Sequence, residues 1–475
     1  MKTLPRILRS ALAGAAACWL GTAASLGQSQ ANFVGNWNFA QFGTPARLTL
    51  VTANTPVFGN NYLTLRDVPE KTNFMARMVP MTVDGSGNFS GPGNGIITVA
   101  GPGLVQAVPA GESPVMFSVN AAQDLAFAAN LPPGGSQQEL MLMLKAPASL
   151  TAAEMAGVWK MVTLGTPREL QLRWSTNYLD PQHPVDGIFE IEGRSSFGTG
   201  NGTLTVAGDG SFSLVFGPDT MNGTATPGAS GLLTVVIPMP PNPAMTLLFY
   251  VNQSKNVMAA VHTEPNYQEI VVAVKLPSAQ TEGESQGLWR VGGLETPGLL
   301  SLITNGLGFV MDLPGKNNFA VHRETIHIGH TGIFTAPADR TVGRVSIVTP
   351  GAVQVAGTND TGGSFSSTLW CNAGKDFLIG TRADSSHELT LVARAPAESL
   401  AGPGEFGLIH IKTNQPPLRV NLYWASAANR VLQMSTNPVN PASWNDLAET
   451  LGGHTHSPSP GSLPRAYYRL RQPTP

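Results

Sequence analysis

A serine flanked by glycines is the first group in this sequence that could do chemistry. The string GESQG at residues 283–287 has the Gly-x-Ser-x-Gly form of a hydrolase nucleophile elbow. Such an elbow needs a strand before the serine and a helix after it. Here the string lies in a connecting segment and runs into the apolar stretch that begins around Trp289, which predicts a strand. We therefore expect no catalytic role for Ser285.

Histidines in the third part of the chain are candidate metal ligands. His322, His327 and His330 lie within the string HRETIHIGH. Ligands on one strand share a face only when an even number of residues separates them, and His322 and His327 are an odd number apart. His454 and His456 do share a face but have no third ligand nearby. The pattern predicts surface histidines and no metal site.

One glutamate recurs at the same place in each third of the chain. Glu139, Glu269 and Glu388 each precede an apolar stretch that ends in proline. Glycosidases use paired carboxylates, but one acid in each repeat does not make a pair, and an acid at the start of a strand usually faces solvent or a neighbouring cation. The polar loop at residues 84–88, DGSGN, lacks the bidentate acid of a calcium loop and is typical of a hairpin turn. We predict no catalytic residue and no cation site.

Composition and charge limit the compartment and the partners. Residues 1–31 combine three early cations, an uncharged Ala- and Leu-rich run and a small polar end, which is typical of a secretory signal peptide. Cys18 lies inside the apolar run, so we do not expect a lipoprotein cleavage site there. Cys371 is then the only remaining cysteine, and no disulfide can form within the chain. Because only 12% of the residues are charged and the charges are scattered, we expect neither nucleic acid nor an anionic membrane as a partner. No apolar stretch after the signal peptide has spanning length, so we expect no transmembrane segment.

Most of these candidate residues lie within three copies of one sequence pattern. Each copy opens with Gly-x-Trp and Thr-Pro, continues through a Gly-rich turn that ends in Phe, and closes with the glutamate, an apolar run and a proline. The copies start at Gly35, Gly157 and Gly287. Their length differences are confined to loops, as expected for homologous domains in tandem.

Within each copy, short runs of alternating apolar residues are joined by turn residues, and helical periodicity is missing. A meander of about eight strands loses its exposed edges by closing. We predict an all-β chain of three tandem antiparallel meander barrels of about 120 residues each plus a small C-terminal β module, with β-sandwiches as the alternative. The predicted divisions are the signal peptide at 1–31, repeats at 32–152, 153–282 and 283–402, and a degenerate fourth start with the C-terminal module at 403–475.

The end of the chain resembles the C-terminal modules of many secreted multidomain proteins of environmental Gram-negative bacteria. The resemblance rests on LQMSTN at 432–437, on Trp444-x-x-Leu447 and on YYRL at 467–470. It covers about 60 residues. It implies export or surface display and carries no catalytic residues.

The repeats resemble the calycin group of lipocalin-like and avidin-like barrels, in which Gly-x-Trp opens the first strand and a cation on the last strand crosses the indole. In a closed meander these strands are neighbours, and a cation on the tryptophan face seals the apolar interior. The predicted closure pairs are Trp37 with Lys145, Trp159 with Lys275, and Trp289 with Arg394.

The last strands, such as EIVVAVK at 269–275, are apolar on both faces, although a barrel strand in water should alternate. Either adjacent copies pack through the outer face, or an apolar lumen receives a ligand.

Together these observations predict a secreted or surface-displayed, non-catalytic binding or scaffold protein. Its expected partner is an extracellular surface, a matrix polymer or a small apolar ligand, and tandem copies would raise avidity. No cofactor is expected. The alternatives are binding of apolar small ligands in the barrel lumens and a secreted hydrolase of polymers. A hydrolase would show clustered acids or a nucleophile and base in one copy only.

Overall fold

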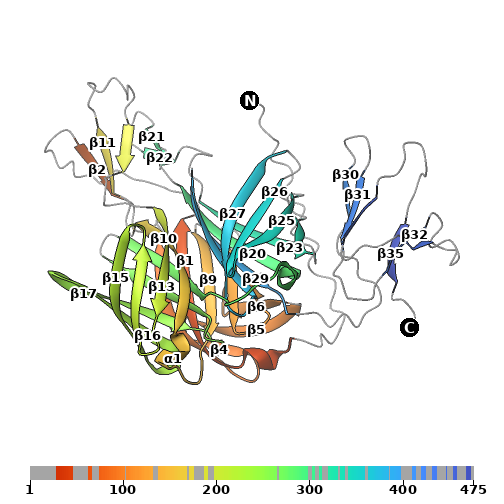
Figure 1. The fold of residues 1–475 in the computed structure, drawn as a ribbon. Helices are drawn as coiled ribbons and strands as arrows, with labels where there is room; N and C mark the ends of the chain where they lie inside the picture. The colour runs from red at the N-terminus through yellow and green to blue at the C-terminus, as the bar shows by residue number, and fades with distance from the viewer. Residues whose placement is uncertain are drawn as a thin grey trace.

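In the computed structural model the chain is almost wholly antiparallel β-structure (Figure 1). Backbone and side chains are described for residues 28–45, 74–101, 103–131, 137–167, 197–264, 267–297, 319–329, 332–336, 341–358, 362–384 and 386–396; elsewhere only the backbone of individual strands is described. Residues 1–27 of the predicted signal peptide, with Cys18, lie outside the described residues.

Each repeat closes into a barrel of eight strands. Barrel 1 consists of β1 (Gly35–Pro45), β3 (Met75–Val83), β4 (Asn88–Ser90), β5 (Asn94–Gly101), β6 (Leu104–Pro109), β7 (Val115–Val119), β8 (Leu125–Asn130) and β9 (Gln137–Lys145). Barrel 2 consists of β10 (Gly157–Pro167), β13 (Gly198–Val206), β14 (Ser211–Phe216), β15 (Asp219–Pro227), β16 (Leu232–Met239), β17 (Asn242–Val251), β18 (Val257–Thr263) and β19 (Tyr267–Lys275). Barrel 3 consists of β20 (Gly287–Pro297), β23 (Ala320–Ile328), β24 (Ile333–Ala336), β25 (Thr341–Thr349), β26 (Ala352–Thr358), β27 (Ser364–Cys371), β28 (Phe377–Ala383) and β29 (Ser386–Arg394). The prediction of three tandem meander barrels is confirmed, and the sandwich alternative is wrong.

The recurring Gly-rich turn has a backbone reason. Its second glycine has a positive φ in every copy, at 84° for Gly87, 87° for Gly210 and 74° for Gly332. This left-handed region favours glycine because a Cβ clashes there. The phenylalanine two residues later is buried in the barrel interior, as Phe212 is in barrel 2. The motif thus reverses the chain and returns an aromatic side chain to the core.

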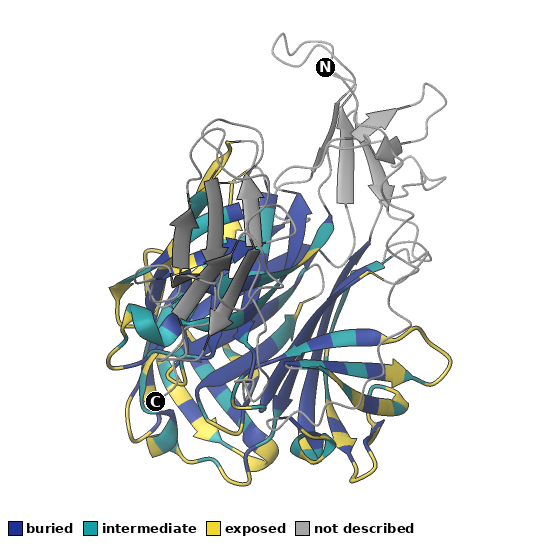
Figure 2. Ribbon diagram, turned by 90° about the vertical axis from the view of Figure 1, so that its right-hand side faces the viewer, coloured by how far each residue is buried: buried dark blue, intermediate teal, exposed yellow. Residues whose placement is uncertain are grey.

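The three barrels share one apolar core. The last two strands of each barrel bury one face in the barrel interior and the other against the neighbouring barrels, so Val271 belongs to the interior of barrel 2 and Val272 to the shared core. The strands with two apolar faces therefore lie where barrels pack together, which Figure 2 shows as buried strands gathered between the barrels. The shared core comprises Ala40, Phe42, Leu125, Phe127, Ala129, Leu140, Leu142, Leu144, Val162, Leu164, Val257, Ala259, Ile270, Val272, Val274, Leu294, Phe377, Ile379, Leu389, Leu391 and Ala393.

Contacts between the barrels follow a closed cycle. β3 of barrel 1 lies against β18 of barrel 2, the corresponding β13 of barrel 2 lies against β28 of barrel 3, and β23 of barrel 3 lies against β8 of barrel 1. Each junction joins the start of one barrel to the end of another. Such a head-to-tail contact forms a ring when its rotation closes, and here it closes after three copies with pseudo-threefold symmetry.

A polar ring of turns joins the barrels at the end where the first strands begin. The Asn120 Nδ2 donates to Asp376 Oδ2 and the Asn252 Nδ2 donates to Asp124 Oδ2, each at 2.9 Å. Both carboxylates are 2% exposed. At the third junction, a Cβ on Gly374 would lie 2.8 Å from the Asn256 Nδ2, so the turns of barrels 2 and 3 also approach each other closely. Burial, with the nearby Asp124 charge as a smaller cause, raises the pKa of the Asp376 carboxyl.

The first strands end at Thr-Pro at the opposite end of the barrels, where three connecting segments of the chain begin. They return to the barrels at Phe74, Phe197 and Phe319, whose ring centroids lie 5.6–6.1 Å apart. Within the loops, β2 (Tyr62–Arg66) of copy 1 forms one sheet with β11 (Gln171–Ser175) and β12 (Gly187–Glu190) of copy 2. The loop of copy 3 forms the pair β21 (Leu302–Thr304) and β22 (Val310–Asp312), and β21 contacts β12. These strands gather beyond the barrel ends (Figure 1), and we call them the loop platform.

After barrel 3 the structure describes the backbone of six short strands, which form two three-stranded sheets. The first sheet orders β30 (Ile409–Lys412), β31 (Arg419–Tyr423) and β34 (Gly453–His456); the second orders β33 (Asn445–Asp446), β32 (Val431–Ser435) and β35 (Tyr467–Arg471). Side chains here, those of His454, His456 and Trp444 included, lie outside the described residues. The resemblance of this region to export modules stays a prediction.

Candidate functional site

The tryptophan and the cation of each repeat lie opposite each other at one end of the barrel. Trp37 pairs in register with Lys145, Trp159 with Lys275, and Trp289 with Arg394. The cationic group lies 5.8, 6.0 and 5.8 Å from the ring centroid in barrels 1, 2 and 3. The first and last strands therefore meet at a cation over an indole face in all three copies.

A short helix before each first strand completes this closed end. The helices are η2 (Gln30–Phe33), α1 (Ala152–Met155) and η4 (Glu282–Ser285), and the last residue of each is buried. The carbonyl of that residue accepts from the tryptophan Nε1 at 2.7–2.8 Å. Ser285 is one of these buried residues and is followed by β20, not by a helix. The structure thus gives Ser285 a place in barrel closure and does not build a nucleophile elbow.

Replacement of Lys275 by methionine is expected to lower the free energy of unfolding by about 1–2 kcal/mol. The substitution keeps the apolar stem but removes the ammonium, which donates to the Glu154 carbonyl at 2.9 Å and lies over Trp159. Urea unfolding followed by circular dichroism measures the change. The control is Lys255→Met, since Lys255 pairs with the Glu154 carboxylate and leaves the closure intact. Equal losses in the two variants would show that the closure pair has no special role.

The opposite end of each barrel, which we call the mouth, is lined by polar groups. Trp37 and Phe39 of β1 face the interior of barrel 1, so Gln41 shares their face, as Glu139 shares the face of Met141 and Met143. The recurring glutamates thus point into the mouths and are not solvent-facing. Glu139 is 9% exposed. Of the two expected environments, solvent or a neighbouring cation, Glu388 has the second, since Arg382 Nη2 lies 3.3 Å from its Oε2, whereas Glu139 is buried beside Gln41.

The side chains that contact the recurring glutamate differ between the barrel mouths. In barrel 1, Gln41 Nε2 donates to Glu139 Oε1 at 2.7 Å and Arg77 Nε donates to Gln41 Oε1 at 2.8 Å. In barrel 2, Tyr267 Oη donates to Glu269 Oε2 at 3.4 Å. Burial raises the pKa of both the Glu139 and the Glu269 carboxyl. Neither mouth places a second carboxylate directly opposite its glutamate, since Gly43 and Gly165 occupy those positions.

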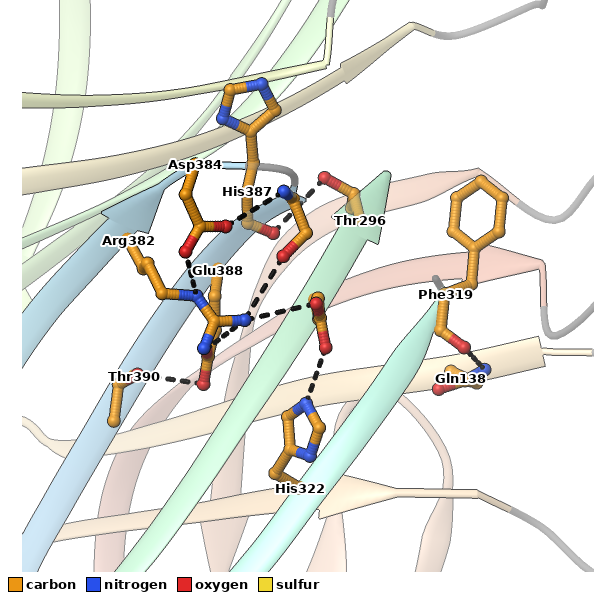
Figure 3. Close-up of polar contacts among 11 residues, drawn as sticks. Gln138, Thr296, Phe319, His322, Arg382, Asp384, His387, Glu388 and Thr390 are labelled. Carbon is orange, nitrogen blue, oxygen red and sulfur yellow. Dashed lines mark hydrogen bonds and ion pairs between the residues drawn. The ribbon is translucent and has the colours of Figure 1, made fainter. Parts of the chain in front are cut away.

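The mouth of barrel 3 does contain a pair of carboxylates (Figure 3). Glu295 lies directly opposite Glu388 on neighbouring strands. Arg382 Nη2 bridges them, at 3.1 Å from Glu295 Oε1 and 3.3 Å from Glu388 Oε2. His322 Nε2 lies 2.9 Å from Glu295 Oε2. The expectation of one acid in each repeat is therefore wrong for copy 3. The signal that could have revealed it is Glu295 itself, which replaces the glycine that precedes Thr-Pro in the other copies.

The charges in this mouth neutralise one another. The hydrogen bond from His322 is the main cause that lowers the pKa of the Glu295 carboxyl, and the same contact raises the pKa of the His322 imidazole. The contacts with His322 and Arg382 thus favour the ionised form of Glu295. A glycosidase acid requires the opposite, a carboxyl kept protonated by an apolar environment.

The other sequence candidates are separated in space. His322 and His327 lie on opposite faces of β23, and His330 lies outside the described residues. Asp84 accepts from the Ser86 and Asn88 backbone N–H groups at 2.8 and 2.9 Å, and these bonds close a hairpin turn. Within the described ranges, no group of three or more His, Cys, Asp or Glu side chains is placed to hold a metal ion.

No protein-family model matches the sequence, and no curated protein matches it. Among solved structures, a double mutant of transferrin binding protein B from Haemophilus parasuis Hp5 aligns with 10% identity over 76% of this chain and 75% of that chain, with a TM-score of 0.23. The isotype 1 transferrin binding protein B of serogroup B Neisseria meningitidis aligns with 9% identity over 76% of this chain and 99% of that chain, with a TM-score of 0.19. Likeness at this level carries no argument about function.

In the part of the chain that the structure describes, no helix has the length and apolarity to cross a membrane.

The His322 and Glu295 contact predicts a pH-dependent contribution to stability. Because the folded pKa of His322 is raised, its stabilisation is fully present below the unfolded value near 6.5 and is lost as the pH rises through the folded pKa. The groups that face His322 are Glu295, Glu388 and Arg382. His322→Gln should therefore cost more stability at pH 5.5 than at pH 8.5, measured by urea unfolding at both values. A cost independent of pH would show that the imidazolium is not what stabilises the mouth.

Proposed function

We propose that this chain is a secreted or surface-displayed, non-catalytic binding and scaffold protein that contacts an extracellular surface or matrix polymer through its loop platform. The observation that carries the proposal is the sheet in which β2 of copy 1 pairs with β11 of copy 2. Loops of separate repeats are thereby joined at one end of the ring, where the shared core holds their bases in fixed positions. Binding residues are often carried on loops that a rigid scaffold positions.

The barrel interiors support this choice over storage of a ligand in a lumen. The described interior of barrel 2 is filled by buried side chains such as Trp159, Phe212, Leu233 and Phe249. The described interiors of barrels 1 and 3 are filled in the same way. A cavity lined by Ser118 and Arg290 lies between barrels 1 and 3, so it does not supply a lumen.

Removal of the platform tests the proposal. Residues 46–73, 168–196 and 298–318 would each be replaced by a short Gly-Ser turn, which is feasible because the strands that flank them are paired antiparallel neighbours up to Gly43 and Met75, Gly165 and Gly198, and Glu295 and Ala320. We expect the full chain to be retained by at least one polymer in a panel of cellulose, chitin and peptidoglycan. The trimmed chain should lose that retention by more than about tenfold while keeping its thermal transition. Retention of the trimmed chain at the same level would contradict the proposal.

The hydrolase alternative has one specific observation in its favour, the pair Glu295 and Glu388 in copy 3 alone. Arg382 contacts both carboxylates, and the lowered pKa of Glu295 speaks against a role of Glu295 as the general acid. Release of soluble sugars from the same polymers by the full chain, abolished in Glu388→Gln, would establish the hydrolase and replace the scaffold proposal.

A further inference from the structure

The three junctions between barrels repeat one pair of positions. The residue after each first-strand tryptophan, which is Asn38, Lys160 or Arg290, points away from its own barrel interior. It faces the neighbouring barrel: Lys160 lies over Trp370, Arg290 lines one cavity with Ser118, and Asn38 donates to the Ser230 carbonyl of barrel 2. The position to compare in the neighbouring barrel is the residue two places before the turn asparagine. That second residue is Tyr250, Trp370 or Ser118. The three junctions therefore have equivalent positions that are occupied by different residues.

Two junctions fill this place with an aromatic ring. Between barrels 2 and 3, the Lys160 Nζ lies 4.5 Å from the Trp370 ring centroid, the shortest cation and ring contact among the described residues. Between barrels 1 and 2, Tyr250 packs against the shared core, and Asn38 Nδ2 donates to the Ser230 carbonyl at 3.2 Å. The position thus holds a planar aromatic side chain at two junctions, and at the junction of barrels 2 and 3 a cation lies over it.

The third junction, between barrels 3 and 1, has Ser118 in that place and contains a cavity of about 500 Å³. The cavity is lined by Leu104, Met116, Ser118, Phe127, Ala128, Ala129, Arg290, Val291, Arg323, Glu324 and Thr325. Ser118 lacks the ring that tyrosine or tryptophan supplies at the other junctions, so part of this volume is the space of the missing side chain. Arg290 remains in place, with its Nη1 3.3 Å from Thr325 Oγ1.

The polarity and charge of the lining residues indicate which kind of molecule the cavity would bind. Its walls are mostly apolar, and they contain two guanidinium groups against one carboxylate, those of Arg290, Arg323 and Glu324. Arg323 is exposed, so this wall reaches the surface. A volume of this size lies within the range of small-molecule sites.

We propose that this cavity binds a small planar aromatic molecule that carries one carboxylate. Its ring occupies the place that Trp370 fills at the neighbouring junction, beside the Arg290 guanidinium, and its carboxylate balances the excess positive charge of the walls. The site is independent of the loop platform, so it can exist whether or not the platform binds a polymer.

Titration calorimetry of the full chain with indole-3-acetate tests the site. We expect saturable binding of one molecule per chain. Ser118→Trp, which installs the ring found in copy 3, should weaken binding by more than about tenfold, whereas Ser90→Trp, at an exposed position of barrel 1, should leave it unchanged. Absence of saturable binding at millimolar indole-3-acetate, or equal binding by Ser118→Trp, would overturn the proposal.

The neutral analogue indole-3-acetamide separates the ring from the charge. Native protein should bind the amide about tenfold more weakly than the acid, and Arg290→Met should remove that difference. Equal binding of acid and amide by the native chain would refute the role assigned to the positive charge. This comparison uses the native protein and so holds even if a variant fails to fold.

Discussion

Replacement of Leu142 by alanine is expected to lower the free energy of unfolding by about 2–5 kcal/mol and to destabilise all three barrels at once. Leu142 is fully buried in the shared core, where it lies opposite Ala40 on one side and Phe127 on the other. Removal of its side chain leaves a cavity that the surrounding strands cannot fill, since they also form barrel walls.

The measurement is thermal unfolding combined with hydrogen exchange resolved by peptide. Protection should fall in β19 and β29 as well as in β9, because strands of all three barrels meet in this core. Leu131→Ala is the matched control, since Leu131 is 48% exposed in the same copy. Loss of protection confined to barrel 1 would show that the barrels unfold independently and that the shared core does not couple them.

Replacement of Asp124 by alanine is expected to cost about 2–4 kcal/mol through the polar ring. Its Oδ1 accepts from the Asn120 Nδ2, and its Oδ2 accepts from the Asn252 Nδ2 and the Ser254 backbone N–H. The alanine variant leaves buried donors of two barrels without this acceptor. Removal of the charge also relieves its repulsion of Asp376, which offsets part of the loss.

Urea unfolding across pH distinguishes these two effects. Because the folded pKa of Asp376 is raised, the free energy of unfolding falls as the pH rises through that pKa, and this fall should be shallower in Asp124→Ala. The control is Asp209→Ala, since Asp209 caps an exposed hairpin turn at Ser211 and should produce a smaller shift. An Asp124→Ala variant as stable as the control would show that the polar ring does not hold the barrels together.

A closed ring of barrels changes how the three repeats can bind a partner. Separate domains on flexible linkers gain avidity by binding several sites one after another. Barrels fixed around one core instead present three sets of loops at set positions, so their combined surface can act as one site. The pairing of β2 with β11 across copies is the local sign of that arrangement.

The candidate site was only partly predictable. The positions of Glu139, Glu269 and Glu388 follow from the repeat, but their direction does not, because it depends on how the last strand enters the barrel. Glu295 stood in the sequence as an ordinary acid in a variable position. It becomes half of a pair only because the register places it opposite Glu388, and a one-residue shift would turn it to the other face.

The sequence by itself determined the local features of this protein. These are three copies of one unit, short antiparallel strands, glycine turns, and a tryptophan and a cation at the two ends of each unit. These follow from residue type and spacing along the chain. Only the tertiary structure decided that the second apolar face of each last strand packs against another barrel, that the ring closes after three copies, and that Ser118 leaves a cavity beside Arg290. The reason is physical: an apolar face requires burial, but hydrophobic contact is non-directional and does not specify which surface will cover it.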